Sequence, residues 1–403
     1  MEFVIKISQF LLSLSFLIVL HELGHFIPAK LFKTRVEKFY LFFDVKFSLF
    51  KKKIGETVYG IGWLPLGGYV KISGMIDESM DTEQMAQEPQ PWEFRSKPAW
   101  QRLIIMLGGV TVNFLLALII FIITSFFYGD EVISADSLED GFRVENPTLL
   151  DLGLKTGDEI IKVGDENVIN FKDASTNIIG AESITFIRDG EKKTIDLPID
   201  FLDKFMSTKE YGLFKLRIPF MVAAVQDSSL NVNADLKEGD IIASINGKKL
   251  KYFDELNDVV EPLKGQTVNV KILREDNLIT KQLVLDENGK FGIQPGVSEK
   301  RFEELGYFDI TRKEYSFGES FGVGLNKFTK TISDYGKQLK VIFNPSTGAY
   351  KGVGGFKAIY DQFPSVWSWE YFWWITAFLS IMLAVLNLLP IPALDGGHVM
   401  FLL

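Results

Sequence analysis

Two histidines and a glutamate with the spacing that zinc hydrolases use lie near the amino terminus, in His21-Glu22-Leu23-Gly24-His25. Residues four apart share one face of a helix, so both imidazoles can reach one metal ion. A glutamate beside the first histidine can act as the general base. The fourteen preceding residues, Ile7 to Leu20, carry no charge, whereas a soluble metalloprotease helix would show a polar face. The motif therefore predicts metal chemistry at the depth of a membrane.

The composition limits which other ligands such a site can have. The 403 residues include no cysteine and three histidines, the third being His398, so Cys-ligated zinc and disulfides are excluded. A third protein ligand must then be His398 or a carboxylate. Hydrophobic residues make up 47% of the chain, which fits a few spanning helices joined to a sizeable soluble part. The net charge of −9 argues against nucleic acid as a partner.

A second polar motif, Leu394-Asp395-Gly396-Gly397-His398, follows the last apolar segment. Catalytic zinc keeps three protein ligands and one open position for water. We favour Asp395 as the third ligand, because an Asp-Gly-Gly turn lets the backbone approach closely and directs the carboxylate inward. His398 is the alternative ligand, with a supporting or substrate-facing role as its other interpretation.

Three apolar segments are long enough to span a membrane, at residues 3–29, 103–127 and 371–394. Residues 30–53 contain eight Lys/Arg and two acidic residues, so the positive-inside rule places this loop in the cytoplasm. Residues 129–370, with 40 acidic and 30 basic residues, can then lie on the other side. Counting crossings from there brings the ends of the first and third segments, and hence both polar motifs, to the same side of the membrane.

Aromatic and β-branched residues punctuated by glycine make residues 39–53 and 57–71 candidate β-hairpins rather than helices. Such apolar hairpins beside spanning helices are expected to dip into the membrane, with a small soluble sheet as the alternative. Residues 77–91 are acidic and rich in Gln and Pro, which is typical of a linker. The whole connecting region spans residues 30–100.

An internal repeat occupies the middle of the chain. Gly153-Leu154-Lys155-Thr156-Gly157-Asp158 and Asp235-Leu236-Lys237-Glu238-Gly239-Asp240 lie 82 residues apart, and each precedes an alternating strand. The pattern resembles that of PDZ domains, which bind extended peptides by adding a strand to a sheet edge. It predicts two α+β PDZ-like domains, at 129–210 and 211–298.

Residues 299–366 are expected to form a connector that contains one amphipathic helix. Apolar residues recur every three or four positions from Phe317 to Ile342, with lysines off the stripe. The stripe could lie on the membrane surface or pack against the PDZ-like pair. Further on, Pro390 and Pro392 must interrupt the third apolar helix. Asn387, just before them, could hold a substrate segment or an oxyanion, or could join helices by a hydrogen bond.

Taken together, these motifs resemble the site-2 protease family of intramembrane zinc metalloproteases, in particular its bacterial members with two PDZ domains. The resemblance covers essentially the whole chain. It rests on the His21–His25 motif, Pro65-Leu66-Gly67-Gly68-Tyr69-Val70-Lys71, Trp100-Gln101-Arg102 leading to Asn113, and the stretch from Asn387 to His398.

The resemblance implies Zn²⁺ held by His21, His25 and Asp395, with Glu22 as base. It implies cleavage of single-span proteins in the bacterial inner membrane, with the active site towards the cytoplasm and the PDZ-like domains outside the cell or in the periplasm. Family substrates are anti-sigma factors already trimmed by another protease, and remnant signal peptides. The PDZ pair is expected to exclude substrates with bulky domains. The hairpin region with Gly67 and Gly68, together with Asn387, is expected to contact the substrate.

The chain departs from the family pattern at three places. Gly109-Val110 stands where relatives often have Gly-Pro before the asparagine of the second span, and Leu41-Phe42-Phe43-Asp44 replaces a glycine-rich hairpin motif. Family members also continue into a fourth spanning helix, before which this sequence stops at Leu403. The second departure weakens the prediction of substrate pairing at the hairpin more than the prediction of the metal site.

The combined prediction is a membrane protein with an α-helical transmembrane core, a membrane-associated β-hairpin region and two α+β PDZ-like domains, acting as an intramembrane zinc endopeptidase. The main alternative is a catalytically inactive PDZ membrane adaptor whose metal is structural. A metal transporter ranks last, because the second span offers few polar residues to line a path.

Overall fold

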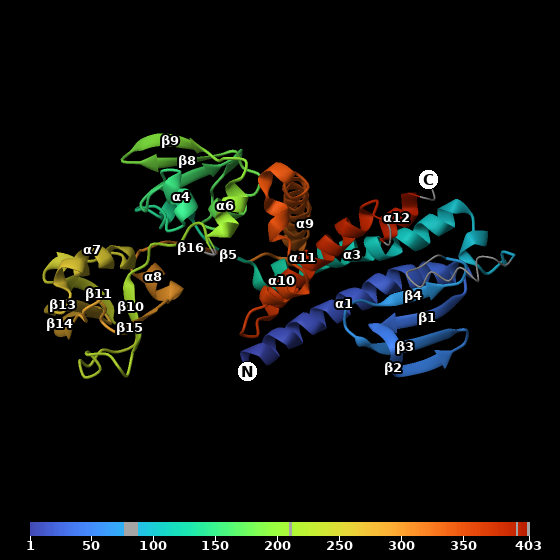
Figure 1. The fold of residues 1–403 in the computed structure, drawn as a ribbon, viewed down its shortest axis with the longest axis horizontal. Helices are drawn as coiled ribbons and strands as arrows, with labels where there is room; N and C mark the ends of the chain where they lie inside the picture. Colours follow the sequence, from blue (N-terminus) through green and yellow to red (C-terminus); the bar gives the residue numbers. More distant parts are fainter. Residues whose placement is uncertain (76–87, 209–211, 392–393, 401–403) are drawn as a thin grey trace. The chain divides into compact units, whose positions relative to one another are not determined.

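The computed structural model describes residues 1–75, 88–208, 212–391 and 394–400. The chain divides into two compact units (Figure 1). The first comprises Met1–Asp130, Lys313–Lys337 and Val353–Leu403, and the second comprises Glu131–Arg312 and Gln338–Gly352.

Within the described part of the chain, three helices, all in the first unit, are long and apolar enough to cross a membrane: α1 (Glu2–Leu31), α3 (Ala99–Tyr128) and α11 (Trp369–Leu388). The prediction of three spanning segments is confirmed at this level. Each of the two 30-residue helices is about 45 Å long, more than the roughly 30 Å of hydrocarbon in a bilayer.

The third predicted span ends too late, because α11 stops at Leu388 rather than at Leu394. Leu389 is extended (ψ 142°), as is usual for a residue before proline, and Pro390 has no N–H to continue the helical hydrogen bonds. The predicted Asp-Gly-Gly turn is also wrong, since Asp395 begins a short helix, α12 (Asp395–Met400). Gly396 lies against the end of α11, where an added Cβ would come within 2.5 Å of the Leu389 carbonyl oxygen.

Small and polar residues join the three long helices. A Cβ on Gly24 of α1 would collide with the carbonyl oxygen of Gly108 on α3, so the two backbones are in direct contact there. The Ser13 hydroxyl lies 2.9 Å from that of Thr376 and links α1 to α11. Ser380 donates to the backbone carbonyl of Asn113 at 2.8 Å and links α11 to α3.

The part of the chain between α1 and α3 forms a four-stranded sheet. Its neighbouring strands follow the order β2-β3-β1-β4. Of these four described strands, β2 and β3 form a hairpin, whereas β1 runs parallel to β3 and antiparallel to β4, which is an outer strand. Of the predicted linker, residues 77–87 lie outside the described residues. The strands are β1 (Val36–Leu41), β2 (Phe43–Ile54), β3 (Thr57–Leu64) and β4 (Tyr69–Ile72).

The predicted amphipathic helix is present as α9 (Phe317–Ile342). Phe328 and Ile332 pack against an apolar cluster of α3 and α11, and the Tyr335 ring lies 6.2 Å from that of Phe378. Packing of the stripe against the spanning helices was neither of the two predicted arrangements. Phe317, Phe321 and Leu325, at the start of the helix, are exposed.

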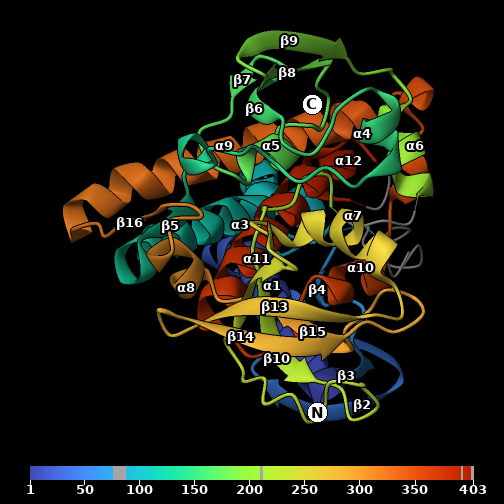
Figure 2. The same ribbon diagram turned by 90° about the vertical axis from the view of Figure 1, so that its left-hand side faces the viewer.

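The second unit contains two lobes, each built on an antiparallel sheet; strands β10, β13, β14 and β15 of the second are visible in Figure 2. The first lobe has the strand order β7-β6-β8-β9 and the second β14-β13-β11-β10-β15, with β12 paired to β11. The first lobe consists of α4 (Pro147–Asp151), β6 (Glu159–Val163), β7 (Glu166–Asn167), α5 (Asp173–Thr176), β8 (Ser183–Arg188), β9 (Glu191–Asp196) and α6 (Phe201–Ser207).

The second lobe consists of β10 (Phe220–Val225), β11 (Ile241–Ile245), β12 (Lys248–Lys249), α7 (Leu256–Val260), β13 (Thr267–Arg274), β14 (Asn277–Val284) and β15 (Ile293–Gly296). After it come α8 (Glu299–Glu304) and β16 (Ile310–Lys313), which pairs with β5 (Asp130–Ile133), and later α10 (Phe356–Asp361).

The two copies of the sequence repeat make the same contacts. Asp158 is buried, binds Arg188 (2.6 Å) and accepts from the Lys155 N–H (2.8 Å). Asp240 is likewise buried, binds Arg274 (2.8 Å) and accepts from the Lys237 N–H (2.8 Å). Each buried carboxylate therefore ties the turn of the repeat to the end of a later strand, so the internal repeat is structural as well as sequential.

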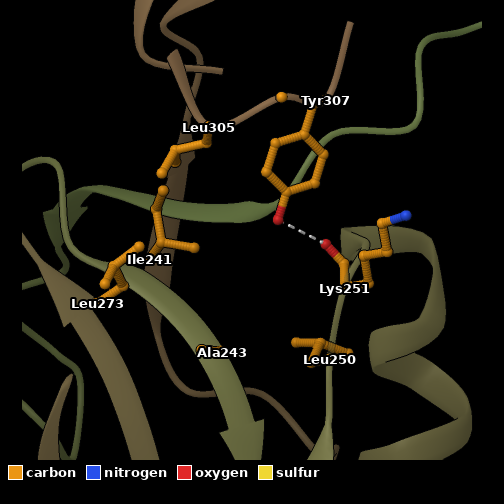
Figure 3. Close-up of a pocket in the computed structure, with 8 residues that line it drawn as sticks. Ile241, Ala243, Leu250, Lys251, Leu273, Leu305 and Tyr307 are labelled. Atoms are coloured by element: carbon orange, nitrogen blue, oxygen red, sulfur yellow. Dashed lines mark hydrogen bonds between the residues drawn. The ribbon is translucent and has the colours of Figure 1, made fainter. Parts of the chain in front are cut away.

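Asp140 of the first lobe joins the second through the Lys251 ammonium group and the Tyr252 hydroxyl, the latter at 2.5 Å. These two donors hold the pKa of Asp140 below its usual value. A cavity of about 280 Å³ lies beside this contact. The Tyr307 hydroxyl donates to the Lys251 carbonyl there, at 3.1 Å, and Figure 3 draws this hydrogen bond among the lining side chains. None of the predicted site residues lines it; the lining is Ile241, Ala243, Leu250, Lys251, Leu273, Leu305, Gly306 and Tyr307.

The contact between α1 and α3 predicts opposite effects for two glycine-to-alanine changes. Gly24→Ala forces a methyl group against the α3 backbone and should lower the free energy of unfolding by about 1–3 kcal/mol. Gly336→Ala, on α9 where an added Cβ meets nothing within 4 Å, should raise it by about 0.5–1 kcal/mol. Denaturant unfolding of the purified protein in detergent measures both. Equal shifts for the two variants would contradict the close contact.

Candidate metal centre

Three side chains from both ends of the chain meet at one point of the first unit. His21 and His25, one turn apart on α1, bring their Nε2 atoms to 3.3 Å from each other. The Oδ2 atom of Asp395, at the start of α12, lies 3.4 Å from Nε2 of His21 and 3.5 Å from Nε2 of His25. Among the described residues, these three form the cluster of His and carboxylate groups able to share one ion.

The spacing of these atoms fits a tetrahedral zinc site. Zinc binds histidine nitrogen and carboxylate oxygen at about 2.0–2.2 Å, which places tetrahedral ligands about 3.3–3.5 Å from one another. The three observed separations of 3.3, 3.4 and 3.5 Å fall in this range. Asp395 Oδ2 is also buried without a hydrogen-bond partner, which is costly for a carboxylate oxygen unless a cation faces it. The residues therefore fit the metal that the sequence predicts.

His398 does not belong to this cluster. It lies three residues after Asp395 on α12 and is partly buried. Of the two ligands that the sequence left open for the third position, the structure brings Asp395, and not His398, to the histidines. The break after Leu388 is what makes this possible, because it allows α12 to pack against both α3 and α11.

Glu22, the predicted base, is half-buried next to His21 on α1. Gly68 lies beside it, since a Cβ there would come within 3.6 Å of Glu22 Cγ and 2.7 Å of the Tyr40 carbonyl oxygen. Gly67 faces the Phe43 ring instead, at 2.8 Å from an added Cβ. The sheet edge that carries Gly68 thus reaches the predicted catalytic glutamate.

Asn387 also lies at the centre, because the end of α11 directs it towards α1. Its Nδ2 atom is 3.5 Å from Nε2 of His21, and the residue is 8% exposed. This contact joins α11 to α1, so it agrees with the helix-joining interpretation as well as with a role at the centre.

Sequence reasoning missed the part played by α3. The Ile105 carbonyl lies 2.8 Å from Nδ1 of His25, and Nδ2 of Asn113 lies 3.0 Å from Nδ1 of His21. Between them, Gly109 leaves room for both rings, since a Cβ there would come within 2.8 Å of His21 Nδ1 and would also collide with His25. The available signal was the spacing of four between Gly109 and Asn113 in an otherwise apolar segment.

The chain is similar to known proteases over its whole length. The profile of peptidase family M50 matches residues 9–403. A Borreliella burgdorferi protein named "Putative zinc metalloprotease" is 30% identical, over 96% of this chain and 87% of the relative. The "Regulator of sigma E protease" of Haemophilus influenzae is 27% identical, over 100% of this chain and 91% of the relative.

Zinc binding should depend on Asp395 and not on His398. Loss of a hydrogen bond that supports a ligand can weaken metal binding by about 100-fold. Asp395→Ala removes a ligand itself and should weaken zinc binding by more than that. His398→Ala serves as the matched control on the same short helix and should keep one zinc per chain. Metal analysis after dialysis against a chelator measures the stoichiometry. Full zinc occupancy in Asp395→Ala would assign the third position to another group.

Proposed function

Because the chain belongs to peptidase family M50, the family of the site-2 proteases, we propose that it is an intramembrane zinc endopeptidase that cleaves single-span membrane proteins. The observation that carries the proposal is the position of the His21, His25 and Asp395 cluster on and beside helices apolar enough to span a bilayer. Charged groups in such helices are costly and are usually retained for function.

In this proposal His21, His25 and Asp395 hold the zinc ion. When bound, zinc polarises the scissile carbonyl and lowers the pKa of water. The family membership supports this metal, and the donor set of two imidazoles and one carboxylate matches catalytic zinc sites with an open fourth position.

Glu22 handles the proton in the proposed reaction. Its carboxylate accepts a proton from the attacking water and then delivers it to the leaving amine, so one residue serves both halves of the hydrolysis. Its position next to His21 and beside Gly68, where it is partly buried, supports this role.

The substrate must be extended at the cleavage point, because helical hydrogen bonds shield the peptide carbonyls. As one of the two outer strands of the sheet, β4 can add an extended segment by backbone pairing. Gly67 and Gly68 precede this strand, and the absence of a side chain at Gly68 leaves the backbone close to Glu22. Asn387, beside His21, is placed to hold a substrate carbonyl or the oxyanion.

We further propose an inner-membrane location, with the metal centre towards the cytoplasm and the two lobes on the other side. The excess of lysine and arginine in residues 30–53 supports this orientation. The two lobes are proposed to be PDZ-like domains that limit access of substrates with bulky domains. Their repeated Asp–Arg contacts support an origin by duplication.

The candidate substrates are anti-sigma factors shortened by an upstream protease, and remnant signal peptides. The name of the Haemophilus influenzae relative, "Regulator of sigma E protease", connects that protein with a sigma factor and so supports the first class. Both classes are single-span segments, which fits a metal centre built among spanning helices.

Cleavage of a model single-span substrate should depend on Glu22. Glu22→Gln removes the proton acceptor while preserving the shape of the side chain. General acid–base catalysis contributes about 10²–10⁴-fold to a rate, so turnover in proteoliposomes should fall by about this factor or more. Glu370→Gln, an exposed carboxylate at the start of α11, is the matched control and should retain activity. Mass spectrometry of the products measures turnover and locates the cut.

Two results would separate this proposal from the adaptor hypothesis. An adaptor with a structural metal would bind zinc and show no zinc-dependent cleavage in any membrane substrate tested. Unchanged turnover by Glu22→Gln would exclude Glu22 as the base.

A further inference from the structure

One face of the second spanning helix contacts both histidines of the metal centre. Ile105, Gly109 and Asn113 are spaced by four residues and therefore lie along one stripe of α3. Ile105 reaches His25, Asn113 reaches His21, and Gly109 leaves space for the two rings. All three residues are buried, and Asn113 is 0% exposed.

The contact of His25 determines which of its nitrogens carries the proton. A backbone carbonyl can only accept a hydrogen bond, so Nδ1 of His25 donates to the Ile105 oxygen at 2.8 Å. In the neutral ring Nε2 then keeps its lone pair. This is the atom that faces Asp395 Oδ2 at 3.5 Å. His25 is thus held in the tautomer that can bind a metal through Nε2.

His21 needs the same tautomer, because its Nε2 is also the atom nearest to Asp395. Its Nδ1 must then donate a hydrogen bond, and the group that faces it is the Asn113 amide at 3.0 Å. The amide nitrogen points at Nδ1, while Asn113 Oδ1 is buried without a hydrogen-bond partner. A half turn about the last side-chain bond exchanges these two atoms and brings an acceptor to Nδ1.

We propose that Asn113 is a positioning residue whose amide oxygen accepts the Nδ1 proton of His21 and so holds Nε2 of that ring ready for zinc. The inference rests on the metal site of the proposed function.

A purely structural role for Asn113 accounts for less of its environment. The link between α11 and α3 uses the backbone carbonyl of Asn113, which accepts from Ser380, and leaves its side chain to His21. Supporting groups of this kind orient metal-bound histidines in many sites, and their loss typically costs about 10–100-fold in metal affinity.

Zinc affinity of the full chain in detergent tests the proposal, measured by competition with a chromophoric chelator. Asn113→Leu has a similar volume and no acceptor, and should weaken zinc binding by about 10–100-fold. Asn113→Asp keeps an acceptor for the Nδ1 proton and should bind zinc nearly as tightly as the parent. Thr111→Val, exposed on another face of α3, is the matched control and should leave the affinity unchanged.

The histidine tautomer gives a readout that packing alone does not change. The chain has three histidines, so NMR of protein labelled with ¹⁵N-histidine shows six ring nitrogens, and His398→Gln removes two. In the metal-free parent, Nδ1 of His21 should carry the proton and Nε2 should not. In metal-free Asn113→Leu, Nδ1 should show mixed protonation, and Asn113→Asp should restore the proton on Nδ1.

Several outcomes would overturn the inference. One is parent-like zinc affinity together with an unchanged His21 tautomer in Asn113→Leu. Another is an Asn113→Asp protein that unfolds like the parent yet has lost its zinc affinity. This second outcome tests the inference even if Asn113→Leu does not fold. A parent chain that binds no zinc would reject the metal site itself, which is a different result from parent-like variants.

Discussion

The direct backbone contact between α1 and α3 is the constraint on which the metal centre depends. At Gly24 and Gly108 neither helix has a side chain to separate the two, and Gly109, one residue on, leaves the space that both imidazoles occupy. With the helices so close, the Ile105 carbonyl and the Asn113 amide reach the outer nitrogens of the histidines directly. A side chain at any of the three glycines would move the supports away from the rings, because the colliding atoms include backbone or ring atoms that cannot move alone.

Several polar groups in these apolar helices form hydrogen bonds to neighbouring segments of the unit. Hydrogen bonds between helices join Ser13 to Thr376 and Ser380 to the Asn113 carbonyl, and Gln9 donates to the Pro364 carbonyl at 3.0 Å. A polar group without a partner in such an environment costs free energy. Two of the buried polar atoms that do lack a partner, Asp395 Oδ2 and Asn113 Oδ1, are both next to the histidines. A cation bound at the centre would therefore offset the free-energy cost of these buried atoms and stabilise the helical unit.

The sequence predicted the helices and the residues of the centre better than it predicted their surroundings. Long uncharged segments identify spanning helices because hydropathy alone determines them, and the count of crossings brought Asp395 to the side of His21 and His25. The contacts of Asn113 could not be predicted in this way. An apolar helix in a bilayer shows no polar face, so its sequence does not reveal which side meets another helix. The same difficulty applies to α9, whose apolar stripe fits a membrane surface and a protein surface equally well but packs in part on α3 and α11.

The end of α11 shows how a break in a helix can be a requirement of the site. Asp395 follows Leu388 by seven residues, so a continuous helix would place it about 10 Å further along the axis and within about 20° of the same direction. Leu388 is 46% exposed and faces away from the helical core, whereas Asn387 is buried and faces His21. An uninterrupted α11 would therefore direct Asp395 outwards. Pro390 prevents this, and α12 turns the carboxylate back towards α1, while Gly396 lets the new helix lie against the end of α11. The proline thus serves the metal centre through backbone geometry alone, by bringing the third ligand from a separate helix to a pair of histidines that one helix already supplies.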